Sequence, residues 1–170
     1  MKQPVVNTDT PQLPRFVRLP FAVLPNALKT APLQRVLNLL FTAHLETGEL
    51  DVLATRNVLV RVLDADLDFG LTLVAGKLRV QSPSANPDLT IAGTVYTFLQ
   101  LATRREDSDT LFFRRQLRMS GDTELGLYVK NFLEGVEPES LPLQPALGHM
   151  LDYSLRAADL IDGFGGNRSA

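Results

Sequence analysis

The stretch LRMSGDTELGLYVKNFLEGVE, residues 117–137, holds a short alternating run and an amphipathic run on either side of a Gly-Asp break. Leu117 and Met119 alternate with polar residues, which predicts a short strand ending at Gly121. Asp122 is well placed to cap a helix that begins after the break. Apolar residues then recur at intervals of three and four and predict one helical stripe, formed by Leu125, Tyr128, Val129, Phe132, Leu133 and Val136. The function depends on whether this stripe faces packed core or a bound molecule.

Upstream, residues 49–91 have a period of two, which is typical of strands with one apolar and one polar face. The alternating apolar positions are Val58, Val60 and Val62; Leu67, Phe69, Leu71 and Leu73; Leu78 and Val80; and Leu89 and Ile91. Ala75-Gly76, between two of these runs, predicts a tight hairpin turn. We therefore expect a largely antiparallel sheet whose apolar face needs a layer of helices.

Segments with a helical period are predicted to form that layer. One helix is predicted to start at Pro32 and stop at Gly48, with an apolar face of Leu33, Val36, Leu37, Leu40, Phe41, His44 and Leu45. A second covers residues 95–102, capped by Thr94, with Val95, Phe98, Leu99 and Ala102 on its stripe. A single turn from Asp109 and a last helix between Leu147 and Ile161 are also expected. This order predicts an α+β layer sandwich, with His44 as a core or boundary residue rather than a ligand.

The two ends of the chain differ from this body. The predicted divisions are a tail and Pro-rich apolar segment (1–31), the domain (32–137), and a connector, C-terminal helix and frayed end (138–170). The run from Phe16 to Leu24 is too apolar for a free linker. We expect it to pack on the domain, with a membrane surface or a partner as the alternative.

The composition excludes several functional classes. With 17 Lys and Arg against 19 Asp and Glu, the chain lacks the basic surface that general nucleic-acid binding needs. The absence of cysteine excludes disulfides and thiolate sites, and two histidines, His44 and His149, give a catalytic metal little support. The sequence shows neither a secretory pattern nor an apolar run of roughly 20 residues, so a cytoplasmic protein is expected.

Enzyme motifs are scarce. The sequence contains no phosphate-binding glycine loop, nucleophile elbow, zinc-protease helix or EF-hand loop. Asp64, Asp66 and Asp68 have strand spacing, so they would share one face and could bind a cation. A solvated sheet face or turn is the favoured interpretation.

A cluster of arginines is more suggestive, because guanidinium groups bind phosphate in bidentate fashion and could hold an anionic headgroup beside an apolar cavity. Its members are Arg104, Arg105, Arg114, Arg115 and Arg118. Pairing with the neighbouring acids Glu106, Asp107 and Asp109 is the favoured interpretation.

The run DSDTLFFRRQLRMSGDTELGLYVKNFLEGVE, residues 107–137, resembles the C-terminal part of a sterol-carrier-protein type two (SCP-2-like) domain. More specifically it resembles the UbiT-like (YhbT-like) accessory factors of anaerobic ubiquinone biosynthesis in proteobacteria. The pieces that carry this resemblance are DTLFF, GDTELGLYVKN and VAGKL (74–78), and LETGEL (45–50) extends it over about residues 33–137.

The resemblance implies a roughly five-stranded, mainly antiparallel sheet covered by helices, with an apolar tunnel and with neither catalysis nor a cofactor. It also implies a prenylated ubiquinone precursor or a phospholipid as ligand. The implied partners are iron–sulfur hydroxylation proteins like UbiU and UbiV and other ubiquinone-biosynthesis enzymes, in the cytoplasm with peripheral contact to the inner membrane. The expected tunnel-lining residues are Phe69, Leu71, Leu73, Phe98, Leu117, Met119, Leu125, Tyr128, Val129, Phe132, Leu133 and Val136.

Alternatives stay open from the residues themselves. On sequence pattern alone, a filled core without ligand is favoured, and only the resemblance favours a tunnel. A phospholipid-binding protein of lipid homeostasis is another alternative. A lipid-modifying hydrolase or acyltransferase would have to use Asp64, Asp66, His44 or His149. The hydroxyl of Tyr128 could contact a quinone or headgroup oxygen, or reach solvent.

Overall fold

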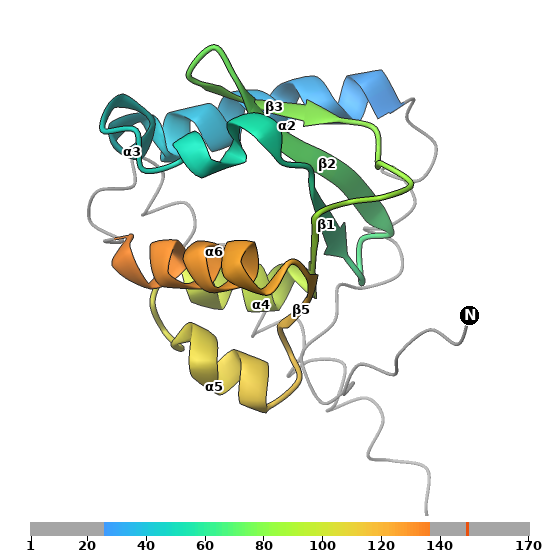
Figure 1. Cartoon of the computed structure of the whole chain (residues 1–170). Coiled ribbons are helices and arrows are strands. Elements are labelled where there is room, and N and C mark those ends of the chain that lie inside the picture. Colours follow the sequence, from blue (N-terminus) through green and yellow to red (C-terminus); the bar gives the residue numbers. More distant parts are fainter. Residues whose placement is uncertain (1–25, 137–148, 150–170) are drawn as a thin grey trace, which may run out of the picture.

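The computed structural model describes residues 26–136 and residue 149 (Figure 1). The elements, in chain order, are α2 (Asn26–Leu40), α3 (Thr42–Glu46), the 3-10 helix η1 (Asp51–Thr55), β1 (Val58–Val62), β2 (Leu67–Val74), β3 (Lys77–Gln81), β4 (Leu89–Gly93), α4 (Val95–Ala102), α5 (Ser108–Phe113), β5 (Arg118–Gly121) and α6 (Thr123–Gly135). The run from Phe16 to Leu24 and the helix expected between Leu147 and Ile161 lie outside the described residues, apart from residue 149.

The strands form one sheet in the order β3-β2-β1-β4-β5. Neighbouring strands pair antiparallel except β1 and β4, which are parallel. Val60 of β1 lies between Phe69 of β2 and Ile91 of β4, so the alternating apolar positions form one continuous face. The predicted α+β fold with a five-stranded, mainly antiparallel sheet is confirmed.

The hairpin predicted at Ala75-Gly76 joins β2 to β3. Both residues have positive φ, 51° and 71°, as a two-residue hairpin of type I′ requires. Gly76 adopts this conformation freely, whereas Ala75 does so against the usual preference of residues with a Cβ.

Helices α4 and α6 lie next to each other, and α2 runs along β3 (Figure 1). Three short polar side chains fix the helix starts. The hydroxyl of Thr94 accepts a hydrogen bond from the Thr97 N–H at the start of α4, and Asp107 accepts one from Thr110 N–H at the start of α5. Asp122 accepts hydrogen bonds from the first-turn amides of α6, as predicted.

Three predictions about the N-terminal half are wrong. Helix α2 begins at Asn26 rather than at Pro32, which lies inside it. Proline has no backbone N–H, so the hydrogen bond that residue 32 would donate within the helix is missing, and α2 continues without it. The helix also divides at Phe41 into α2 and α3, and residues 51–55 form η1 instead of extended strand.

Two amides of α2 bind the free edge of β3. The side chain of Asn38 donates to Leu78 O (2.8 Å) and accepts from Leu78 N (3.0 Å). Gln34 accepts a hydrogen bond from Val80 N (3.0 Å). These side chains satisfy main-chain groups on the edge of β3 that pairs with no other strand among residues 26–136.

Candidate functional site

An apolar cavity of ≈ 370 Å³ lies between the sheet and the helices. Residues of α2, η1, four of the strands (β1 to β4), α4 and α6 line it. Every lining side chain among the described residues is aliphatic or aromatic, and only Tyr128 carries a polar group. A hollow of this size falls within the range of small-molecule sites, and its wall is suited to hydrocarbon.

Helix α6 forms one wall because it diverges from the sheet along its length. Near its start, a Cβ at Gly126 would lie 3.4 Å from Leu89 Cδ1, and Leu125 is buried in the core. Further along, the same stripe lines the cavity with Val129, Phe132, Leu133 and Val136. One apolar stripe therefore serves as core at its beginning and as cavity wall at its end.

The residues predicted to line a tunnel divide accordingly. Eight border the cavity: Phe69, Leu71, Phe98, Tyr128, Val129, Phe132, Leu133 and Val136. Four do not: Leu73, Leu117 and Leu125 are core residues, and Met119 packs against that core.

The wall contributed by α2 and the adjoining Phe41 was missed as a site. It comprises Leu33, Val36, Leu37, Leu40 and Phe41. The signal is present in the sequence, which predicts these residues as one apolar helical face. Nothing in the period of that face distinguishes contact with side chains from contact with a ligand.

The Tyr128 hydroxyl is engaged by the protein. It donates a hydrogen bond to the backbone carbonyl of Glu49, which joins α6 to the turn after α3. The hydroxyl is thus used at the cavity wall to hold two segments together.

His44 belongs to the same corner. Its Nδ1 lies 3.0 Å from Glu49 Oε2, and the Thr47 hydroxyl donates to Glu49 Oε1 at 2.9 Å. The hydrogen bond from His44, followed by that from Thr47, lowers the pKa of Glu49 below its ordinary value. The imidazole packs edge-on against Phe132, with ring centroids 5.2 Å apart, and its Nε2 is buried with no hydrogen-bond partner among the described residues.

The carboxylates of residues 64–68 do not share one face, so that expectation is wrong. Asp64 is buried after β1 and accepts a hydrogen bond from Val95 N (2.8 Å), whereas Asp66 adopts a turn conformation with φ 48°. Asp68 lies on β2 and pairs with Arg61 at 3.1 Å. The chain turns between β1 and β2, which breaks the strand spacing. Across the described residues, no group of three or more His, Cys, Asp or Glu could hold a metal ion.

The residues considered for catalysis are not assembled at the cavity. Asp64, Asp66, His44 and His149 are all absent from its lining, and His149 is exposed.

No arginine of the predicted cluster lines the cavity. Arg114 pairs with Glu106 at 3.4 Å, as the favoured interpretation expected. Asp107 caps α5 and Asp109 pairs with Lys130, so these two acids have other uses. Arg104 donates to the backbone carbonyl of Glu134 at the end of α6.

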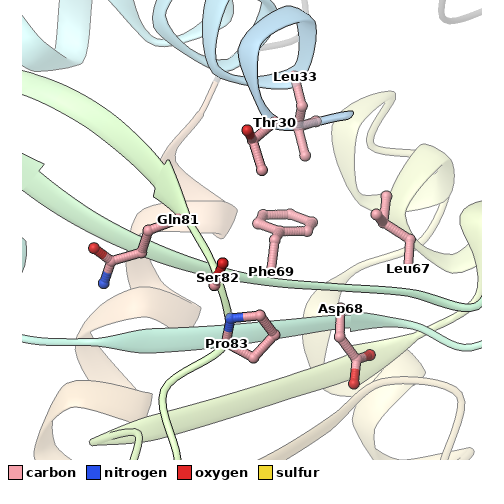
Figure 2. Close-up of a pocket in the computed structure, with 8 residues that line it drawn as sticks. All are labelled: Thr30, Leu33, Leu67, Asp68, Phe69, Gln81, Ser82 and Pro83. Atoms are coloured by element: carbon pink, nitrogen blue, oxygen red, sulfur yellow. The ribbon is translucent and has the colours of Figure 1, made fainter. Parts of the chain in front are cut away.

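A second, much smaller hollow of ≈ 10 Å³ lies beside β2 and β3 (Figure 2). Leu33, Leu67 and Phe69 line both hollows, and the Phe69 ring lies between Leu33 of α2 and Pro83 in this view. Space for about one water molecule is too little for a ligand. The ring of Phe69 therefore forms part of the boundary between the large cavity and this small hollow.

Within the part of the chain that the structure describes, no helix has the length and apolar character needed to cross a bilayer.

The profile described as the SCP-2 sterol transfer family matches residues 37–134. The ubiquinone biosynthesis accessory factor UbiT of Escherichia coli strain K12 is 40% identical over 149 residues, which span 88% of this chain and 82% of that protein. The UbiT protein of Escherichia coli O157:H7 has the same identity and coverage.

Among solved structures, one described as a UbiJ-SCP2 ubiquinone synthesis protein superposes with a TM-score of 0.53 at 23% identity. The match covers 65% of this chain and 91% of that chain, and it supports the shared fold.

Proposed function

This chain belongs to the SCP-2 sterol transfer family, and from that premise we propose that it is a non-enzymatic lipid-binding accessory factor of oxygen-independent ubiquinone biosynthesis. The cavity would hold the polyprenyl tail of a ubiquinone precursor while partner enzymes modify the ring. The identity with UbiT supports the pathway. The cavity itself carries the proposal, because ≈ 370 Å³ of apolar space is suited to an alkyl chain.

The energetics favour a hydrocarbon guest. Each buried methylene contributes about 0.8 kcal/mol, so eight of them give roughly 6 kcal/mol before ordering costs. The described wall offers no further hydrogen-bond donor to a quinone oxygen or a headgroup phosphate, since the Tyr128 hydroxyl already donates to Glu49. We infer that the tail is bound inside and the polar part outside, which also suits a phospholipid.

We infer a carrier rather than an enzyme for the same reason. The described wall offers only the Tyr128 hydroxyl for proton transfer, and that group is held by a backbone carbonyl. The partners we propose are UbiU- and UbiV-like hydroxylation proteins. The protein would bind them in the cytoplasm or at the surface of the inner membrane. We place the lipid-binding unit at residues 32–137, extended to Asn26 because α2 is one continuous helix.

Lipid extraction with a pair of matched variants tests the proposal. Val129→Phe would place a larger side chain in the cavity and narrow it, whereas Val74→Phe makes the same change on an exposed residue of β2 that does not line it. Protein purified gently from anaerobic cells should yield a prenylquinone precursor or a phospholipid by native mass spectrometry. Val129→Phe should lose most of it and Val74→Phe should keep it.

Two results would overturn the proposal. One is wild-type protein that is empty as purified and takes up neither lipid class after delipidation. The other is a lipid content that Val129→Phe leaves unchanged. Anaerobic ubiquinone content in Escherichia coli cells that lack their own UbiT, complemented with each variant, then tests the pathway separately from binding.

A further inference from the structure

The outward side of α5 carries two phenyl rings in solvent. Leu111 of α5 is 0% exposed and anchors the helix, whereas Phe112 is 47% and Phe113 80% exposed. The two rings pack edge to face, with centroids 6.3 Å apart. Helix α5 packs against α6 and lies on the opposite side of it from α2 (Figure 1). Exposed neighbouring aromatic rings of this kind mark an interaction surface.

Side-chain contacts hold α5, the helix that carries both rings, against α6. Besides the Asp107 cap, the Ser108 hydroxyl donates to the Glu134 carboxylate, and Asp109 pairs with Lys130 at 3.0 Å. After Phe113 the backbone reverses at Arg115, which has φ 59°. The fold thus maintains the exposure of both rings.

Arginines lie on both sides of α5 in the sequence. Arg104 and Arg105 precede α5 and Arg114 and Arg115 follow it, and all four are exposed. Between residues 104 and 118 the chain has five arginines and three acids, although its net charge is −2. The α5 surface is defined here as these four arginines with Phe112 and Phe113.

Two of the three local acids are engaged by groups other than arginine. Asp107 caps α5 and Asp109 pairs with Lys130, while the third acid, Glu106, pairs with Arg114. Arg115 makes no ion pair within residues 26–136. Leu127, exposed one helical turn before Lys130 on α6, adds apolar area on the side of α6 that faces α5.

We propose that the α5 surface docks the protein on an anionic phospholipid bilayer. The phenyl rings enter the boundary between headgroups and acyl chains, and the arginines bind lipid phosphates in bidentate fashion. Charge complementarity favours the bilayer, because the chain is acidic overall, yet two exposed arginines, Arg114 and Arg115, directly follow its exposed aromatic rings. The inference rests on the proposed function in one respect, since a carrier of lipid tails must collect them from a membrane.

Vesicle sedimentation of the full chain tests this surface. The probes are vesicles of phosphatidylcholine alone and of phosphatidylcholine with phosphatidylglycerol. Wild-type protein should bind the anionic vesicles more tightly, and high salt should weaken that binding. The double variants Phe112→Ser/Phe113→Ser and Arg114→Gln/Arg115→Gln should each lose about tenfold or more in affinity for the anionic vesicles.

Leu39→Ser is the matched control, because Leu39 is 47% exposed on α2, outside both the cavity lining and the α5 surface. It should bind like wild type. Thermal melts of all variants should agree within a few degrees, since the substituted side chains are exposed. A variant that melts early is replaced by Phe113→Ser alone, for which a clear loss of affinity is again expected.

Three results would overturn the inference: no binding of wild type to anionic vesicles, equal binding to both vesicle types, or anionic binding unchanged in both double variants. The last would place docking on another surface or reserve this one for a protein partner. Failure here is distinguishable from failure of the proposed function. Val129→Phe should still sediment with vesicles while losing its internal lipid, and the Phe112→Ser/Phe113→Ser variant should still accept lipid from detergent solution.

Discussion

Gly121 lies at the junction of β5 and α6, where the backbone has a conformation that side chains disfavour. Its φ is 124°, and a Cβ there would lie 2.3 Å from the Asp88 carbonyl oxygen, which also accepts a hydrogen bond from Asp122 N. We predict that Gly121→Ala destabilises the fold by about 1 to 3 kcal/mol, measured by urea unfolding.

Gly135→Ala is the control for this prediction. A Cβ at Gly135 would meet no described residue within 4 Å and its φ is ordinary, so the free energy of unfolding should change little. Equal stability of the two variants would show that the Asp88 carbonyl moves aside without cost.

Asp88 links stability to pH. The hydrogen bond from Asn57 N (2.7 Å) is the main reason that the pKa of this carboxyl lies below its ordinary value of 3.8, and Arg56 lowers it further. A lowered pKa gives stability that is complete above the ordinary value and is lost as pH falls through the lower folded value. We predict that stability declines below about pH 4.

The variant Asp88→Asn isolates this contribution. It should be less stable than wild type at neutral pH and should lose less of its stability on acidification. Urea unfolding midpoints of both proteins at neutral pH and at about pH 3 measure how much stability each loses on acidification. Equal losses would assign the acid sensitivity to other carboxyls, such as Glu49.

At the scale of elements, the amide of Asn38 fastens the cavity wall α2 to β3. Asn38→Leu keeps the size of the side chain but removes both hydrogen bonds to Leu78, a residue that is 2% exposed. We predict a loss of about 1 to 3 kcal/mol in the free energy of unfolding, because buried main-chain groups lose their partners.

Asn38→Asp should have an intermediate effect, since a carboxylate still accepts from Leu78 N but donates nothing to Leu78 O. An Asn38→Leu protein as stable as wild type would show that water replaces the amide at this edge.

Local sequence rules predicted most elements because each depends on neighbouring residues. Period two identified the strands, and the caps at Thr94 and Asp122 marked two helix starts. The errors occur where distant contacts override local preference. Helix α2 runs through Pro32, and Asp64 leaves the strand pattern to accept the amide of Val95, thirty-one residues away.

The hydrogen bonds from the side-chain amides of α2 to β3 were not predictable from the sequence. Gln34 and Asn38 are spaced as neighbours on one helical face, and such polar pairs are usually solvated. Only the sheet order, which leaves β3 at an edge beneath this helix, gives them backbone groups to bind.

For the whole molecule, sequence period identifies which faces are apolar but not how far apart the layers stand. Leu125 and Val129 belong to one stripe of α6, yet the first is packed in the core and the second lines the cavity. The difference arises from the angle of α6 to the sheet, a tertiary property. The candidate site was therefore predictable as a set of apolar faces and not as a boundary between core and cavity.

An unfilled cavity also forgoes stability. At about 24 cal/mol per Å³, ≈ 370 Å³ corresponds to an upper limit of roughly 9 kcal/mol. We predict that a long-chain prenol at about 100 times its dissociation constant raises the melting temperature by roughly 5 to 10 °C, because ligand binding stabilises the folded state.

Differential scanning fluorimetry measures this shift, with Val129→Phe as the comparison. That variant should respond less, since the new ring takes up part of the space that the ligand needs. A wild-type melting temperature that no prenol or acyl chain changes would contradict a ligand-accepting cavity.

The contact between α2 and β3 has a consequence in crowded solution. A strand arriving from another molecule would find Leu78 N, Leu78 O and Val80 N already occupied by Asn38 and Gln34. The β3 edge of the sheet is thereby closed to pairing with another strand by a helix of the same chain. Protein lacking these amides should form strand-paired oligomers on storage, so two polar side chains of α2 that bind β3 also keep the protein dispersed.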